Sequence, residues 1–268
     1  MNELITNNLW KAKFKAFSIH LTISILLISC FLLVATQVWY PGVLFSLENV
    51  WQGLRILLPV DAILGPLLTL ILFVPGKKGL VGDLITVATI QLLALIAGGY
   101  LIYSQRPEIM VFTADRFEII PSSKFDRENF ADEYFQGSKD EYPLIVYALP
   151  AQTPEEKNDF VLNGIQYQKM SERYRPLANY KDILINKSLV TSSLLVEDEI
   201  SEKALAAFNN KYRDKEILLL PLDATTKSSA IIILDKNTLQ NLGYLDLDPW
   251  KNSKTQAQVE AQAIEFQE

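Results

Sequence analysis

Asp61 is a carboxylic acid in the middle of an apolar run, and its type and position raise the first chemical question about this chain. On insertion scales an ionised acid at the centre of a bilayer costs about 2.5–3.5 kcal/mol, so such a residue usually faces a polar partner or a water-filled cavity. Two functions follow: a docking point for a polar group of a partner, or a site that handles protons. A third interpretation is structural, with Asp61 held by a Thr, by Gln91 or by His20 of a neighbouring span to fix helix packing.

Helix-breaking residues surround this acid. Pro59 and Pro66 lie seven positions apart in the same run, and two prolines in one helix are expected to kink it and free backbone carbonyls. Arg55 precedes Asp61 by six residues, about 9 Å of helix rise, which only a kink and an extended arginine side chain would bridge. The candidate partner-binding or intramembrane polar residues are therefore Asp61, Arg55, Gly65, Pro66, Gln91 and His20.

Three long apolar runs must position these residues, and they cover about 17–40, 54–73 and 84–103. Each has the roughly 20 residues that a helix needs to cross a hydrocarbon core of about 30 Å, and helix is the form that satisfies the backbone there. The first run follows a basic start but ends in Gln37-Val38-Trp39-Tyr40 instead of a small-x-small cleavage site, so we expect a retained signal anchor. A small-residue face, Ala94-x-x-x-Gly98, offers close helix contact in the third run.

Two basic clusters set the expected orientation. Lys11, Lys13 and Lys15 precede the first run, and Lys77 and Lys78 lie in the short turn between the second and third. The positive-inside rule places both in the cytoplasm. Residues 1–16 are then a cytoplasmic N-terminus, and the loop 41–53 and the chain after about 104 lie outside, in the periplasm of a two-membrane bacterium. An aromatic belt of Trp39, Tyr40 and Trp51 fits the outer interface.

Charge separates the two parts of the chain and excludes several functions. Residues 1–103 hold six basic and four acidic residues, whereas 104–268 hold 19 basic and 27 acidic ones. The acidic part argues against nucleic-acid binding. One cysteine, Cys30, and one histidine, His20, leave no His/Cys metal site and no Ser-His or Cys-His nucleophile after residue 104. Nucleotide-binding glycine patterns are also missing, so we expect no enzyme, no cofactor and no metal.

Alternating short strands and helices follow the apolar runs. The sequence predicts a soluble α+β domain over 104–250 and a polar tail over 251–268. The expected strands are 109–113 and 116–120, which form a hairpin turned at Ala114-Asp115, and 144–149, 217–220, 230–234 and 242–247. The expected helices are 153–168, which begins with a capping box at Thr153, and 201–212. The fold class is a membrane protein: three N-terminal transmembrane helices and a soluble α+β domain.

Several short segments, taken in order along the chain, are typical of one family. They are Trp39-Tyr40-Pro41-Gly42, Trp51-Gln52-Gly53-Leu54-Arg55, Asp61-x-x-x-Gly65-Pro66-Leu67-Leu68-Thr69, Pro75-Gly76-Lys77-Lys78, Asp83-Leu84, Gln91-Leu92, Gln105-Arg106-Pro107 and Leu242-Gly243-Tyr244-Leu245-Asp246-Leu247-Asp248-Pro249-Trp250. With this ordered set the chain resembles the TfpX/TfpZ family of type IV pilin accessory proteins, most densely over residues 15–120. The resemblance implies a bacterial inner-membrane protein that assists a cognate major pilin before or during pilus assembly.

The expected function is therefore a non-enzymatic, chaperone-like accessory factor for the major pilin. Its expected partners are the lipid bilayer, the membrane-embedded pilin and the pilus assembly machinery. In this hypothesis Asp61 pairs with a polar group on the pilin helix, and Ala94 and Gly98 pack against that helix. The alternative is a proton-handling membrane enzyme or transporter subunit that uses Asp61. A sensor is disfavoured, because the cytoplasmic parts leave no room for an output domain.

Overall fold

A computed structural model describes residues 2–135, 142–190, 194, 199–226 and 228–250. By its contacts the chain divides into two compact units. The first, here the helical unit, comprises Met1–Pro41 and Asn49–Ser104, and the second, here the sheet unit, comprises Gly42–Glu48 and Gln105–Glu268. The polar tail expected over 251–268 lies outside the described residues.

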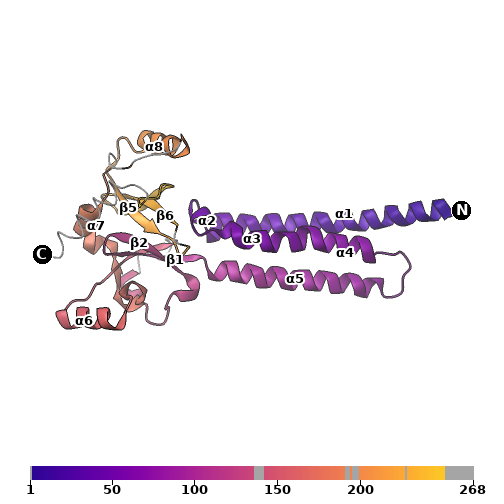
Figure 1. Cartoon of the computed structure of the whole chain (residues 1–268), viewed down its shortest axis with the longest axis horizontal. Coiled ribbons are helices and arrows are strands. Elements are labelled where there is room, and N and C mark those ends of the chain that lie inside the picture. The colour runs from indigo at the N-terminus through magenta and orange to yellow at the C-terminus, as the bar shows by residue number, and fades with distance from the viewer. Residues whose placement is uncertain (1, 136–141, 191–193, 195–198, 227, 251–268) are drawn as a thin grey trace. The chain divides into compact units, whose positions relative to one another are not determined.

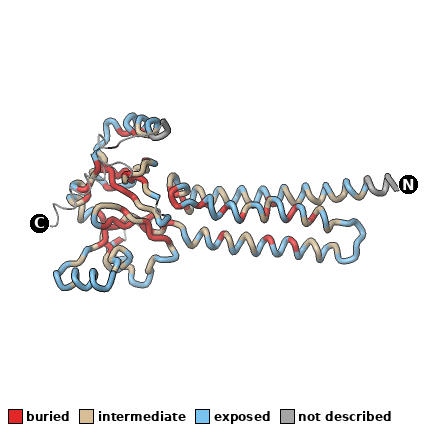
Figure 2. Tube along the Cα trace, viewed as in Figure 1, coloured by how far each residue is buried: buried red, intermediate tan, exposed pale blue. Residues whose placement is uncertain are grey.

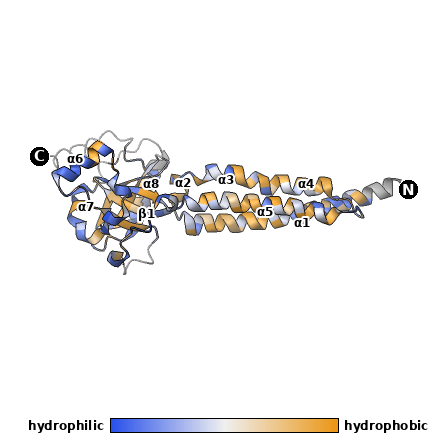
Figure 3. Ribbon diagram, turned by 90° about the horizontal axis from the view of Figure 1, so that it is seen from below, coloured by the Kyte–Doolittle hydropathy of each residue, from blue (hydrophilic) through white to orange (hydrophobic). Residues whose placement is uncertain are grey.

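The helical unit consists of three helical rods that run side by side (Figure 1). The first is α1 (Asn2–Val34) with the π-helical turn η1 (Ala35–Trp39). The second is α3 (Val50–Pro59), η2 (Val60–Leu64) and α4 (Gly65–Leu72), and the third is α5 (Leu80–Ser104). Three stretches are long and apolar enough to cross a membrane: Asn8–Trp39, Val50–Leu72 and Leu80–Ser104. The expected three apolar helices are confirmed, and Figure 3 shows the hydrophobic residues along them.

The second rod is widened where the sequence predicts a kink. Pro66 has no N–H, so the regular i→i+4 ladder cannot continue through it. Instead the N–H of Gly65 donates to the carbonyl of Val60, an i→i+5 bond, and Val60–Leu64 form a single π-helical turn. Such π-bulges are frequent at functional sites, and this one carries Asp61.

The sheet unit is built on one seven-stranded sheet in the order β4-β3-β1-β2-β5-β6-β7. The strands are β1 (Pro107–Thr113), β2 (Arg116–Pro121), β3 (Leu144–Ala148), β4 (Tyr174–Pro176), β5 (Ile217–Asp223), β6 (Ser229–Asp235) and β7 (Asn241–Leu245). β1 pairs in parallel with β3, and β2 pairs in parallel with β5. The remaining neighbours are antiparallel. All six expected strands form, and β1 and β2 make the expected hairpin, with Ala114 at φ 51° in its turn.

Helices and short turns connect the strands. The helices are α2 (Leu44–Leu47), α6 (Pro154–Asn163), α7 (Lys181–Lys187) and α8 (Glu199–Lys211). The 3-10 turns are η3 (Ser122–Lys124), η4 (Asp132–Phe135), η5 (Tyr167–Lys169), η6 (Ser171–Arg173) and η7 (Leu177–Tyr180).

The helix expected over 153–168 begins as predicted but is too long at its other end. The Thr153 hydroxyl accepts the N–H of Glu156 at 3.1 Å, which is the expected cap. The helix ends at Asn163 because Gly164 takes the left-handed conformation, φ 62°, and its N–H bonds back into the last turn. The helix expected over 201–212 is confirmed as α8, which begins two residues earlier and ends one earlier.

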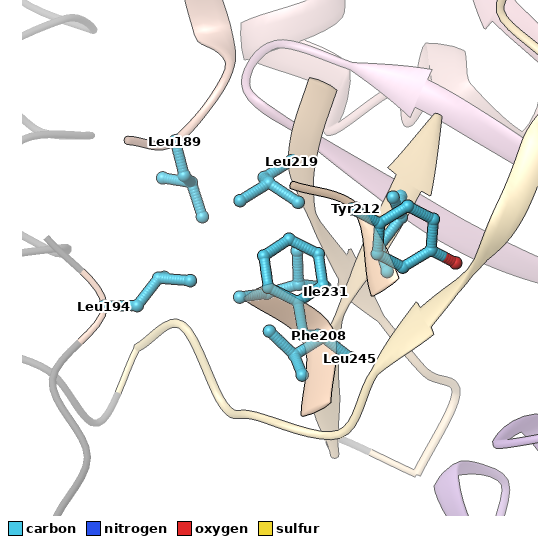
Figure 4. Packing of buried hydrophobic residues seen from close by; sticks show 8 residues of the cluster. Leu189, Leu194, Phe208, Tyr212, Leu219, Ile231 and Leu245 are labelled. Carbon is cyan, nitrogen blue, oxygen red and sulfur yellow. The ribbon is translucent and has the colours of Figure 1, made fainter. Parts of the chain in front are cut away.

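Hydrophobic packing is concentrated in the sheet unit, where the buried residues follow the strands (Figure 2). One cluster lies against β5 and β6 (Figure 4), and it consists of Leu189, Leu194, Phe208, Tyr212, Leu219, Ile231, Ile233 and Leu245. A second lies on β1 and β3 and includes Val111, Val146 and Tyr174. The central residues of β5 and β6 are buried on both faces, which explains their continuous apolar sequence.

The segment Gly42–Glu48, which joins the first two rods, belongs to the sheet unit. Glu48 is buried, and its carboxylate accepts hydrogen bonds from the N–H and the hydroxyl of Thr225 in the turn after β5. The Thr226 hydroxyl donates to the carbonyl of Leu47 at 2.7 Å. These hydrogen bonds attach the segment Gly42–Glu48 to the turn between β5 and β6.

Candidate functional site

A mostly apolar cavity with a polar centre lies in the helical unit at the level of the π-helical turn. Its volume is about 110 Å³. Residues of all three rods line this cavity, here called the Asp61 cavity: His20, Ile23, Ser24, Leu27, Asp61, Ala88, Gln91, Leu92 and Leu95. The first rod packs against η2 and α4, and α5 packs against α3, η2 and α4, so the second rod lies between the other two. Ile23, Leu27 and Leu92 are exposed, and the cavity therefore has an apolar, open side.

Asp61 and Gln91 form the polar centre of the Asp61 cavity. Both side chains are buried. The Gln91 amide donates to Asp61 Oδ1 at 3.4 Å and to the Asp61 carbonyl at 3.5 Å, which are long for N–H···O bonds. Asp61 Oδ2 and Gln91 Oε1 are buried and have no hydrogen-bond partner among the described residues. A buried polar atom without a partner costs about 1–3 kcal/mol of stability. A hydrogen-bond donor that reached Asp61 Oδ2 or Gln91 Oε1 would therefore be bound favourably.

Gly65 makes room for this pair. A Cβ at position 65 would stand 1.9 Å from Gln91 Nε2 and 2.3 Å from Gln91 Cδ, inside van der Waals contact. Gly65 and Pro66 are both buried at the start of α4. The Asp61-x-x-x-Gly65-Pro66 spacing thus has a physical basis: the proline widens the turn that carries the acid, and the glycine admits the amide from α5.

His20 also lines the Asp61 cavity, and its ring bonds to a residue of α4. Its Nδ1 is 2.6 Å from the hydroxyl of Thr69, a buried residue of α4. Ser24, one turn further along α1, is also buried and lines the cavity. The sequence did not single out Ser24, because hydroxyl residues are frequent in apolar helices, and it named Thr69 only as the end of the segment that begins at Asp61. Ser24 adds its hydroxyl group to the cavity wall, and Thr69 holds the His20 ring by its hydrogen bond.

Arg55 stands apart from these residues. Its side chain is exposed, and no ion pair joins it to Asp61 within the part of the chain that the structure describes. Of the six candidates the structure therefore brings together Asp61, Gly65, Pro66 and Gln91, with His20 at the rim, and leaves Arg55 out.

Small residues of α5 contact the other rods of the same chain. A Cβ on Gly98 would lie 2.7 Å from Leu57 Cδ1, and one on Gly99 would lie 3.1 Å from Phe31 Cε2. Gly98 therefore packs against Leu57 of the same chain, and the contact of Ala94 and Gly98 with a partner helix stays a prediction. The Asp61 cavity, in contrast, keeps its open side between α1 and α5.

The two ends of the helical unit differ in chemistry. Lys13 Nζ donates to the Ile71 carbonyl at 3.0 Å, which brings the N-terminal basic cluster to the end of α4, beside the turn that contains Lys77 and Lys78. At the other end the Trp39 and Tyr103 rings lie 5.1 Å apart. One end thus gathers the basic residues, and an aromatic pair lies at the other.

The Asp61 cavity is suited to hydrogen-bonded recognition. Among the described residues Asp61 bonds to the Gln91 amide, and these bonds are long. What the Asp61 cavity can do is accept a hydrogen-bond donor from a group that reaches it through its apolar side. A helix that carries a hydroxyl or an amide among apolar residues has that chemistry.

The chain is similar to fimbrial assembly proteins of Dichelobacter nodosus. It is 28% identical to the fimbrial assembly protein of serogroup I over 214 residues, which cover 75% of this chain and 82% of that protein. The serogroup E1 protein is 29% identical over 214 residues with the same coverage. The protein of serogroups C1 and C2 is 36% identical over 85 residues, 31% of this chain and 65% of that protein. No protein-family profile and no solved structure matches the chain.

Proposed function

We propose that this chain is a non-enzymatic, chaperone-like accessory factor that acts on the major type IV pilin during pilus assembly at the bacterial inner membrane. The similarity to fimbrial assembly proteins over 214 residues carries this proposal. The ordered segments that resemble the TfpX/TfpZ family support it, because they include Asp61, Gly65, Pro66 and Gln91, the residues that shape the Asp61 cavity.

The Asp61 cavity supplies a place for the pilin. A subunit that waits in the membrane presents an apolar helix, and the exposed side chains of Ile23, Leu27 and Leu92 match such a surface. A hydroxyl or amide on that helix would give Asp61 Oδ2 the donor it lacks among the described residues. Interhelical hydrogen bonds of this kind are worth roughly 0.6–2 kcal/mol in membranes, enough for selectivity within a weak, reversible contact.

The proposed topology puts the N-terminus in the cytoplasm and the sheet unit in the periplasm. The contact between Lys13 and the Ile71 carbonyl supports it, because it gathers both basic clusters at one end of the helical unit. In this arrangement the sheet unit is on the side of the pilin head, and the rods are at the depth of its helix. The pilus assembly machinery is the further partner that we propose.

Photo-crosslinking in the native membrane tests the proposal. A photoreactive residue at Leu92, which lines the Asp61 cavity, is compared with one at Ile90, which is exposed on the opposite side of α5 and does not line it. We expect a crosslink to the major pilin from position 92 and a much weaker one from position 90. Because the two positions lie at nearly the same depth, the comparison distinguishes binding of pilin at the Asp61 cavity from random encounter in the membrane.

Two outcomes would contradict the proposal. Equal pilin capture from positions 90 and 92 would show that the Asp61 cavity is not the pilin-binding site. If neither position captures pilin under conditions that capture other membrane pairs, pilin is not the partner of this protein. In the second case a pH-dependent activity that Asp61→Asn abolishes would favour the proton-handling alternative.

A further inference from the structure

A second cavity lies wholly within the sheet unit, where β2 and β5 separate. These two parallel strands pair only at Phe117↔Leu222 and Glu118↔Asp223. Beyond that point β2 continues into η3, whereas β5 ends and the chain turns toward β6. The cavity, here called the β2–β5 pocket, has a volume of about 450 Å³. Its lining residues are Arg116, Glu118, Ile119, Ile120, Pro121, Lys124, Lys169, Asp223, Ala224, Thr225, Ser229 and Trp250.

The position of the β2–β5 pocket is one where folds commonly bind ligands. It opens at the carboxyl ends of two parallel strands whose chains leave in different directions, and such ends form crevices that backbone does not fill. Its volume also lies within the roughly 300–1,000 Å³ typical of ligand pockets.

Part of the charge in the β2–β5 pocket is already neutralised within it. Arg116 bonds to Asp115 at 2.8 Å and to Asp223 at 3.1 Å, and its guanidinium lies 4.2 Å from the centre of the Trp250 ring. Asp223 Oδ1 also accepts the Trp250 indole N–H at 2.8 Å and the Ser229 hydroxyl at 2.7 Å. These five residues form a closed network that shapes one wall and has little capacity for a further partner.

Three other charged residues of the β2–β5 pocket can still bind a partner. Lys124 and Lys169 are exposed at the rim, and neither forms an ion pair within the described part of the chain. Glu118 is half-buried, and among the described residues its oxygens receive two long contacts from the Gln168 amide, at 3.4 and 3.5 Å, while the nearby charges of Arg116 and Lys169 also act on it. Two ammonium groups and one carboxylate thus face the same pocket without short partners.

We propose that the β2–β5 pocket binds a carboxylate of a polypeptide, held by Lys124 and Lys169, while Glu118 accepts a backbone N–H from the same segment. A carboxylate next to a peptide N–H matches the two lysines and the glutamate together. The apolar wall of Ile119, Ile120 and Pro121 accommodates the stem of the side chain. The exposed rim residues Lys124, Lys169 and Thr225 leave the pocket open enough for a chain to enter and leave. This proposal does not depend on the pilin assignment.

Binding of labelled peptides to the full-length protein in detergent tests the proposal. Three fluorescent peptides of the same length are used, and fluorescence anisotropy is measured. The first has two adjacent Asp residues at its centre and an amidated C-terminus, the second has no internal acid and a free C-terminal carboxylate, and the third has Asn in place of Asp and is amidated. We expect binding of the first or the second and none of the third. Which of the two binds identifies whether the carboxylate is a side chain or a chain end.

Paired variants locate the binding. Replacement of both pocket lysines, Lys124→Ala with Lys169→Ala, is expected to weaken the affinity at least tenfold, since charge-assisted hydrogen bonds are lost. The matched control, Lys157→Ala with Lys211→Ala, removes the same charge from exposed lysines of α6 and α8 that do not line the pocket. Equal loss in both variants, equal binding of all three peptides, or binding of none of them would overturn the proposal.

Discussion

Gly65 and Gln91 occupy complementary space: a Cβ on Gly65 would stand 1.9 Å from Gln91 Nε2, so the amide of one helix lies where a side chain of the next would be. The two residues lie in the second and third apolar helices. The absence of a side chain at position 65 lets the Gln91 amide reach Asp61. The packing of the second and third rods therefore determines the hydrogen bonding of Asp61.

Gly65→Ala is expected to destabilise the helical unit. Forcing an extra methyl into a packed site typically costs about 1–3 kcal/mol, and here it must displace Gln91 from Asp61. The thermal midpoint of the protein in detergent should fall, and pilin crosslinking from position 92 should decrease. Gly82→Ala is the matched control, because a Cβ at that helical position meets no atom within 4 Å. An unchanged midpoint in Gly65→Ala would show that Gln91 can move away freely.

Asp61→Asn separates charge from shape. The amide is nearly isosteric and can still bond to Gln91, so folding should be preserved. Hydrogen bonds to charged acceptors are stronger than neutral ones by about 1–1.5 kcal/mol, so pilin association should weaken roughly tenfold. Asp61→Ala should reduce association further, because it also leaves the Gln91 amide without its acceptor. The readout is the amount of pilin crosslinked per amount of protein. Association that is unchanged in both variants would exclude Asp61 from the contact.

Glu48→Gln should remove a pH-dependent loss of stability. Burial raises the pKa of the Glu48 carboxyl, while hydrogen bonds from Thr225 and the charge of Lys124 oppose that rise. The folded protein then binds this proton more tightly than the unfolded chain does, so stability is greatest below the unfolded pKa and falls as pH rises through the folded pKa. The thermal midpoint of the wild type should fall relative to Glu48→Gln across this interval and stay lower above it.

The control for this prediction is Glu155→Gln, which removes an exposed acid from the first turn of α6. Its midpoint should follow the wild type across the same pH range. A constant difference between wild type and Glu48→Gln at every pH would contradict the assignment.

Trp250→Phe should lower the stability of the sheet unit while keeping an aromatic ring in the wall of the β2–β5 pocket. The indole N–H bond to Asp223 is lost, at a cost of about 1 kcal/mol, while the ring face remains for Arg116. The midpoint of unfolding should fall modestly. Trp51→Phe, at an exposed tryptophan, should change it less. A larger effect at position 51 would mean that Trp250 does not support the pocket wall as described.

Local signals in the sequence predicted much of this architecture. Run length alone identified the three apolar helices, and apolar strands bounded by turn residues identified β5, β6 and β7, because each signal lies within a few neighbouring residues. The Gln91–Asp61 partnership was among the interpretations of the buried acid, since few polar residues occur in the apolar runs.

Long-range contacts determined what the sequence did not predict. β4 is three residues long and ends in Pro176, so it has no pattern of its own and exists through its pairing with β3. The parallel pairing of β2 with β5 joins residues more than 100 positions apart. The β2–β5 pocket arises at that junction and is assembled from separate segments, of which only Trp250 belonged to a recognisable motif.

The attachment of Glu48 to Thr225 also sets an order of events during synthesis. The two residues are 177 positions apart, which at about 5–20 residues per second separates their emergence from the ribosome by roughly 9–35 s. Throughout that interval the loop between the first two helices lacks its final acceptor–donor pairing. Completion of β5 and β6 therefore fixes a segment made far earlier, and a nascent chain that stalls before residue 225 leaves Glu48 without its Thr225 donors.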